Sequence, residues 1–136
     1  MPQKGTHQHP QEVYQRLQLC SSYAELLVGL HQKDFVLDFD DEDDFLEEVI
    51  IDQDPWRIIL DDVSYLKPSN SSMNTFDIWM TPEICNSFLL AKDKQLKSYL
   101  SHIHKQCRDK DPEKRPNAVQ LLKTYRDVLQ KIRINT

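Results

Sequence analysis

Glycine is almost absent from this chain of 136 residues, which contains only Gly5 and Gly29. A Gly-rich phosphate loop needs several glycines so that backbone N–H groups can approach the phosphates. A calcium loop of the EF-hand type needs a glycine turn at its centre. The sequence therefore excludes both loops. No apolar run approaches the ~20 residues that a membrane span requires, so we expect no membrane partner.

Cysteine is also scarce, with Cys20, Cys85 and Cys107 alone and no C-x-x-C pair. An odd number of widely spaced cysteines favours buried, reduced thiols over a disulfide framework. Residues 1–10 have neither the apolar core nor the small-residue cleavage pattern of a secretory signal. We therefore expect an intracellular, cytoplasmic protein, with a nuclear location as the alternative.

Charge is divided unevenly along the chain, although the net charge is only -5. Residues 34–62 contain 13 acidic and one basic residue, a net charge of -12, and residues 92–133 contain 12 basic and five acidic residues, a net charge of +7. Opposed patches of this kind can pair within a fold or steer a charged partner. Nucleic acid is not favoured as that partner, because the basic residues alternate with apolar positions and no aromatic stacking set accompanies them.

Neither the histidines near Cys107 nor the acidic run predicts a metal site. His104 and Cys107 are neighbours on a helix, but His102 points elsewhere, so these three residues do not predict a zinc site. The acidic run is better explained as a solvated loop than as a cation site. The sequence therefore predicts no metal, no cofactor and no catalytic residue. The run comprises Asp38, Asp40, Asp41, Glu42, Asp43 and Asp44.

The expected organisation is a disordered tail over residues 1–10 and a single domain over residues 11–136, mainly α with a small β element. Apolar spacing predicts a helix from Val13 to Cys20, a second helix opened by a Ser22/Glu25 capping box, and a third over residues 45–50. Apolar runs at residues 35–39 and 56–60 predict strands.

The C-terminal third has the clearest helical pattern. Leu96, Leu100, Ile103 and Cys107 share one face of a predicted helix. A second helix is expected after Pro116, since proline is tolerated in the first helical turn. Its expected apolar face comprises Ala118, Val119, Leu122, Tyr125, Val128, Leu129 and Ile132.

Between these helices runs Cys107-Arg-Asp-Lys-Asp-Pro-Glu-Lys-Arg-Pro116, which resembles the turn that precedes the last helix of a protein-kinase C-lobe. The resemblance covers residues 96–132, which look like the last two helices of that lobe. Trp79-Met-Thr-Pro-Glu83 resembles the Trp-Met-Ala-Pro-Glu variant of a second kinase motif. The resemblance implies that Arg115 and Glu83 form a buried ion pair, which typically costs about 3–5 kcal/mol when one partner is removed.

Two weaker likenesses follow the order of the same family. Residues 35–39 with 44–50 resemble its hinge strand and following helix, and residues 65–70 resemble the end of its catalytic loop. In that alignment Lys67 and Asn70 are the residual nucleotide-site residues, and Tyr65 takes the place of the catalytic aspartate. A phenol with a pKa near 10 cannot act as that base at neutral pH. An Asp-Phe-Gly motif is excluded by the shortage of glycine.

The sequence therefore predicts a truncated, non-catalytic kinase homologue, not an enzyme, that binds a kinase or a signalling complex as a regulator or adaptor. The acidic run would steer the partner, and apolar side chains would supply affinity. Two alternatives remain: a nucleotide-binding pseudokinase remnant, and a helical binding module unrelated to kinases. The candidate interaction residues are the six acidic residues of the run together with Phe76, Trp79 and Met80.

Overall fold

The computed structural model describes residues 3–4, 12–39, 45–47, 49–53, 56–60, 66–68 and 76–134. Helices predominate over short strands, which confirms the expected class, mainly α with a small β element. The helices and strands are β1 (Gln3–Lys4), α1 (Val13–Gln32), β2 (Phe35–Leu37), β3 (Val49–Gln53), β4 (Trp56–Leu60), β5 (Leu66–Pro68), α3 (Phe76–Trp79), α4 (Thr81–Phe88), α5 (Lys94–Cys107), the 3₁₀ turn η2 (Pro112–Lys114) and α6 (Ala118–Ile134).

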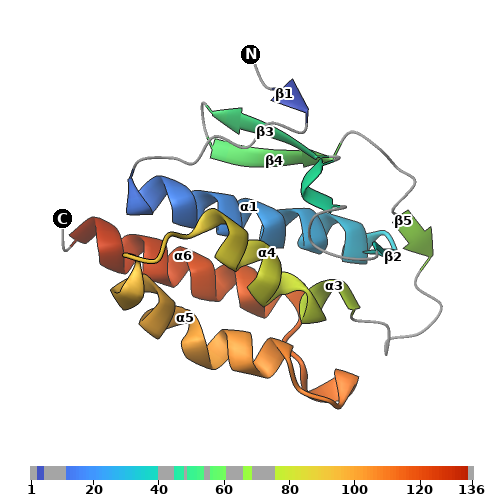
Figure 1. Cartoon of the computed structure of the whole chain (residues 1–136). Helices are drawn as coiled ribbons and strands as arrows, with labels where there is room; N and C mark the ends of the chain where they lie inside the picture. The colour runs from blue at the N-terminus through green and yellow to red at the C-terminus, as the bar shows by residue number, and fades with distance from the viewer. Residues whose placement is uncertain are drawn as a thin grey trace.

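Helix α1 lies at the centre of the fold, between the strands β3 and β4 and the helix α6 (Figure 1). It contacts β4 on one side and α6 on another, and it also touches α4 and β2. A helix enclosed in this way must bury residues around most of its circumference. Its buried residues are Arg16, Leu17, Leu19, Cys20, Ser21, Tyr23, Ala24 and Leu27.

The prediction of two short helices in this region is wrong, because α1 is continuous from Val13 to Gln32. The Ser22 hydroxyl does not cap a new helix. It accepts a hydrogen bond from the backbone N–H of Ile58 at 2.7 Å and so joins α1 to β4. The helix ends at Gln32, and Asp34, with a φ of 62°, then turns the chain sharply into β2; aspartate tolerates this left-handed conformation better than most residues.

Strands β1, β3 and β4 form an antiparallel sheet in the order β1-β3-β4. In its register Val49 faces Leu60 and Ile51 faces Ile58. The predicted helix over residues 45–50 is therefore correct only for residues 45–47. Val49 and Ile51 are buried while Ile50 is half-buried, so the run alternates with the period of a strand.

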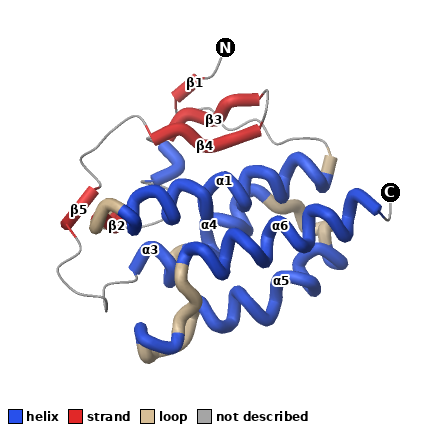
Figure 2. The backbone as a smooth tube through the Cα atoms, turned by 180° about the vertical axis from the view of Figure 1, so that it is seen from behind, coloured by secondary structure: helices blue, strands red, loops and turns tan. Residues whose placement is uncertain are grey.

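Two predicted strands are confirmed as β2 and β4. Strand β2 pairs antiparallel with β5, and Leu37 faces Leu66 in the register. This pair lies at the C-terminal end of α1, apart from the three-stranded sheet (Figure 2). Within the N-terminal segment expected to be disordered, Gln3 and Lys4 form β1 against β3.

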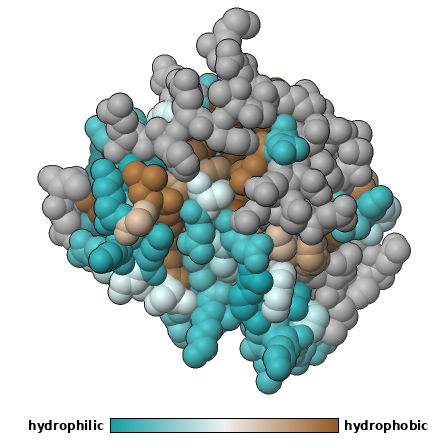
Figure 3. Space-filling view, viewed as in Figure 1, coloured by the Kyte–Doolittle hydropathy of each residue, from teal (hydrophilic) through white to brown (hydrophobic). Residues whose placement is uncertain are grey.

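The two C-terminal helices are confirmed as α5 and α6. One position of the expected apolar face is wrong: Val119 is 60% exposed, and Leu121 is fully buried in its place. Hydrophilic side chains cover the lower part of the molecule in the view of Figure 3, over α5 and the turn that follows it. No helix in the described part of the chain is long and apolar enough to cross a membrane.

Candidate functional site: a buried aspartate at the base of the acidic segment

Asp77 of α3 is fully buried, and it ties together four elements of the fold. Its Oδ2 accepts hydrogen bonds from the backbone N–H of Leu37, at 3.1 Å, and from His31 Nε2, at 2.8 Å. Its carbonyl oxygen accepts from the Tyr23 hydroxyl and the Thr81 hydroxyl, both at 3.0 Å. The end of α1, the strand β2 and the start of α4 are therefore fixed to one residue.

The other carboxylate oxygen of Asp77, Oδ1, is buried and has no hydrogen-bond partner among the described residues. A buried polar atom without a partner costs about 1–3 kcal/mol, and more when it is charged. Burial raises the pKa of Tyr23, and the negative charge of Asp77 raises it further. The Tyr23 hydroxyl therefore stays protonated and remains a donor.

The strand end held by Asp77 leads directly into the acidic run. Asp38 follows Leu37 and is exposed, whereas its neighbours Leu37 and Phe39 are buried. The acidic segment, residues 40–44 of this run, is flanked by two buried aromatic residues, Phe39 and Phe45, whose ring centroids are 5.1 Å apart. Phe45 also packs against Tyr23 of α1 at 5.5 Å. The two flanks of the acidic segment are thus anchored in the core.

Three other predicted site residues differ in their burial. Lys67 is exposed on β5, Phe76 is half-buried against Phe39, and Met80 is buried in the core. The predicted residues Asp40, Asp41, Glu42, Asp43, Asp44 and Asn70 lie outside the described residues. Among the described residues, no group of three or more His, Cys, Asp or Glu side chains could hold a metal ion.

The kinase-like turn brings two arginines to one tryptophan. The guanidinium carbons of Arg108 and Arg115 lie 4.7 Å and 5.0 Å from the centroid of the Trp79 ring. Such cation–π contacts are worth about 0.5–2 kcal/mol, depending on desolvation. Arg115 Nε also donates to the carbonyl oxygen of Asp109 at 2.9 Å, and so fixes the turn.

Glu83 forms a salt bridge with Arg108, at 2.7 Å between Oε1 and the guanidinium. The side chain of Glu83 is 43% exposed, so the carboxylate is not buried as the resemblance implied. A pairing of Glu83 with Arg115 stays a prediction. The observed salt bridge joins α4 to the residue that ends α5.

A buried charge pair, Arg16 and Asp93, lies at the N-terminal end of α1. Arg16 donates to both carboxylate oxygens of Asp93, at 2.6 Å and 2.7 Å, and the side chains are only 2% and 4% exposed. Asp93 also accepts from the N–H of Leu90. Burial opposes ionisation of Asp93, but the hydrogen bonds from Arg16 and the Leu90 N–H and the positive charges of Arg16 and Lys92 together outweigh it, so the pKa of the carboxyl lies below its usual value.

The prediction from sequence missed Asp77 and Arg16, although each left a signal. Arg16 falls on the apolar stripe formed by Val13, Leu17 and Cys20, where a charged residue is out of place. Asp77 stands between Phe76 and Ile78. Charged residues are seldom fully buried unless they are paired, so both positions could have been marked as buried pairs.

Comparison with known proteins gives a partial likeness to a kinase. No family model matches the chain. The chain is 40% identical over 55 residues to the protein O-mannose kinase of Gallus gallus, and 40% identical over 60 residues to the human and Macaca fascicularis proteins of that name. These matches cover 39–42% of this chain but only 16–17% of the relatives.

These relatives correct one expectation. The sequence predicted that the protein is not an enzyme, and this is contradicted because the similar proteins are named as a kinase. The chain is therefore similar, over about two fifths of its length, to a kinase-related protein. Its match spans less than a fifth of the length of those relatives, so their activity and substrates are a matter for proposal.

Proposed function

We propose that this chain is the helical lobe of a kinase-related phosphotransferase whose acceptor is a sugar hydroxyl on a mannose-bearing protein. The observation that carries the proposal is that Asp77 fixes the end of β2, next to Asp38. Hydrogen bonds from Leu37 and His31 to Asp77 hold the strand end from which Asp38 projects. The name of the relatives supplies the class of acceptor.

Asp38 is the carboxylate that we assign to the reaction, in place of the catalytic-loop aspartate, whose position Tyr65 takes in the kinase alignment. In phosphoryl transfer of this kind an aspartate receives the proton of the acceptor hydroxyl while the hydroxyl oxygen bonds to the γ-phosphorus of ATP. The bond between the γ-phosphorus and the bridging oxygen breaks, and ADP leaves. Asp38 suits the role because it is exposed while both of its neighbours are buried. A Mg²⁺ ion would neutralise the phosphate charge, and carboxylate oxygens are ligands that it prefers.

The glycine content limits which part of the reaction this chain performs. With two glycines the chain has no Gly-rich phosphate loop. Under the proposal, the nucleotide phosphates are held through Mg²⁺ without such a loop. The carboxylate chemistry, rather than the phosphate loop, is what the described residues support.

The acceptor class can be tested directly. The protein would be incubated with Mg²⁺ and ATP labelled at the γ-phosphate, together with a peptide carrying O-linked mannose or the same peptide without sugar. We expect label on the glycopeptide only, because the acceptor hydroxyl belongs to the sugar. Equal labelling of the two peptides, or no labelling of either, would contradict the proposal.

A protein partner, either a kinase or a signalling complex, remains a second proposal. Its support is the half-buried Trp79 with Arg108 and Arg115 on its ring, since Trp and Arg are enriched among residues that dominate interfaces. A Trp56→Phe background leaves Trp79 as the one tryptophan. Titration with a purified candidate kinase should shift Trp79 fluorescence saturably; an unchanged spectrum would exclude that kinase as a partner at this surface.

A further inference from the structure

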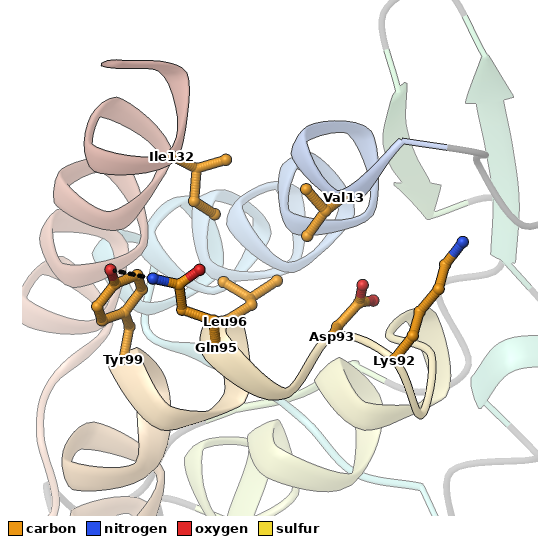
Figure 4. Close-up of a pocket in the computed structure, with 7 residues that line it drawn as sticks. All are labelled: Val13, Lys92, Asp93, Gln95, Leu96, Tyr99 and Ile132. Atoms are coloured by element: carbon orange, nitrogen blue, oxygen red, sulfur yellow. Dashed lines mark hydrogen bonds between the residues drawn. The ribbon is translucent and has the colours of Figure 1, made fainter. Parts of the chain in front are cut away.

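A pocket of about 210 Å³ lies where the first turn of α1, the start of α5 and the end of α6 meet. Figure 4 shows Val13 and Ile132 on one side of it and Gln95 and Tyr99 on another. It is smaller than the roughly 300–1,000 Å³ of a pocket that takes a drug-sized molecule. Its size suits one small ring.

The walls of this pocket are divided into an apolar and a polar part. Val13, Leu96 and Ile132 supply the apolar part, and Leu96 and Ile132 are buried. Gln95 and Tyr99 supply the polar part and are bonded to each other, with Gln95 Nε2 donating to the Tyr99 hydroxyl at 2.9 Å. A ligand that fits both parts has a C–H face and a polar edge.

The hydrogen bond between Gln95 and Tyr99 determines which groups the polar edge of a ligand must carry. Because the Tyr99 oxygen accepts from Gln95, its own O–H can donate to a ligand, while Gln95 Oε1 can accept. A donor and an acceptor side by side match two adjacent hydroxyls, since each hydroxyl both donates and accepts.

Charge in the pocket argues for a neutral ligand. Asp93 lines it, but both of its carboxylate oxygens are bound by Arg16, and one also accepts from the Leu90 N–H. Arg16 neutralises this carboxylate, so it offers little attraction to a cation. Lys92 at the edge of the pocket and Lys131, whose Nζ lies 5.0 Å from the centroid of the Tyr99 ring, are both exposed. Solvent and salt screen their charges, so they offer an anion little attraction.

We infer that this pocket binds a single neutral sugar unit through Gln95 and Tyr99. The site is distinct from the acidic segment, because the pocket is at Val13 and β2 follows the other end of α1. The 20 residues of α1 span about 30 Å at 1.5 Å per residue. A sugar bound here would hold a glycosylated partner in place and would not be the phosphate acceptor. The inference does not depend on phosphoryl transfer.

The test is a titration of the whole chain with methyl α-mannopyranoside, followed through the NMR signals of the Leu96 and Ile132 methyl groups. We expect saturable shifts of both signals. Tyr99→Phe removes only the hydroxyl and should weaken binding about threefold to tenfold, the effect of one hydrogen bond. Gln95→Ala, on an exposed position, should weaken it similarly.

The matched control is Tyr14→Phe, which removes the hydroxyl of a tyrosine on α1 outside this pocket and should leave the affinity unchanged. Three results would each overturn the inference: no methyl shift with the mannoside, equal affinity of the wild type and both pocket variants, or stronger binding of acetate or phosphate than of the mannoside. Since ATP is absent, failure here is separate from failure of the phosphotransferase proposal.

Discussion

Replacing Asp93 with Asn should destabilise the fold strongly, because it removes the negative charge that the buried Arg16 guanidinium contacts at two points. Arg16 is 2% exposed and donates two short, charge-assisted hydrogen bonds to this carboxylate. Removing one partner of a buried pair costs about 3–5 kcal/mol. A domain of this size has a total unfolding free energy of about 5–15 kcal/mol, so the loss is a large fraction of its stability.

The measurement is urea unfolding followed by far-UV circular dichroism. With a slope of about 2 kcal/mol per M, Asp93→Asn should lower the midpoint by about 2 M. The double variant Arg16→Met/Asp93→Asn removes both charges and should recover part of the loss. The control Asp127→Asn breaks an exposed pair with Lys123 of 3.0 Å on α6, which should cost about 0.3–0.5 kcal/mol.

Two outcomes would refute this reasoning. If Asp93→Asn costs no more than Asp127→Asn, the buried pair does not hold α1 against α5. If the double variant is less stable than Asp93→Asn alone, the buried charge of Arg16 is not the source of the loss. A comparable loss in all three variants would point instead to a general sensitivity of the fold.

Three further predictions follow from buried groups. The pKa of Asp93 is lower in the folded chain than its ordinary value of 3.8. The ionised carboxylate therefore stabilises the fold fully above pH 3.8, and this stabilisation is lost as the pH falls through the lower, folded-state pKa. Thermal melts between neutral and acid pH should show this loss of stability in the wild type and not in Asp93→Asn. Asp77→Asn replaces an acceptor that binds the Leu37 N–H and His31 and should cost about 1.5–3 kcal/mol, with faster hydrogen exchange at Leu37; unchanged protection there would contradict the anchoring. Burial raises the pKa of Cys107 to about 12, so iodoacetamide should modify this thiol only as fast as the chain unfolds. Mass spectrometry measures the labelling, and rapid labelling of the native protein would show instead that the thiol is accessible.

The sequence predicts best those helices that bury a single face. Helix α5 buries one face through Leu96, Leu100, Ile103 and Cys107, so its period is visible in the chain. Helix α1 is enclosed by several neighbours, so its faces do not differ clearly in hydrophobicity. Ser22, which resembled a helix cap, instead accepts a hydrogen bond from the Ile58 N–H. Strand β3 follows a short helical segment without a glycine or proline to mark the change.

The site was predicted only in part, and for a related reason. The acidic run is visible as composition, but its anchor depends on contacts between residues far apart: Leu37 and Asp77 are 40 positions apart, and Arg16 and Asp93 are 77 apart. Periodicity cannot indicate which distant residue satisfies a buried charge. The expected pairing of Glu83 came from resemblance, and the salt bridge found is with Arg108.

The role of Asp38 is the central claim, and the most direct measurement compares phosphate transfer from ATP to the mannose-bearing peptide in the wild type, Asp38→Asn and Asp127→Asn. Both substitutions replace an exposed carboxylate with its isosteric amide, but only Asp38 follows the strand end that Asp77 holds. General-base assistance is worth about 10²–10⁴-fold, so Asp38→Asn should lower the rate by at least about a hundredfold while Asp127→Asn retains the wild-type rate. Equal rates in all three proteins would contradict the account.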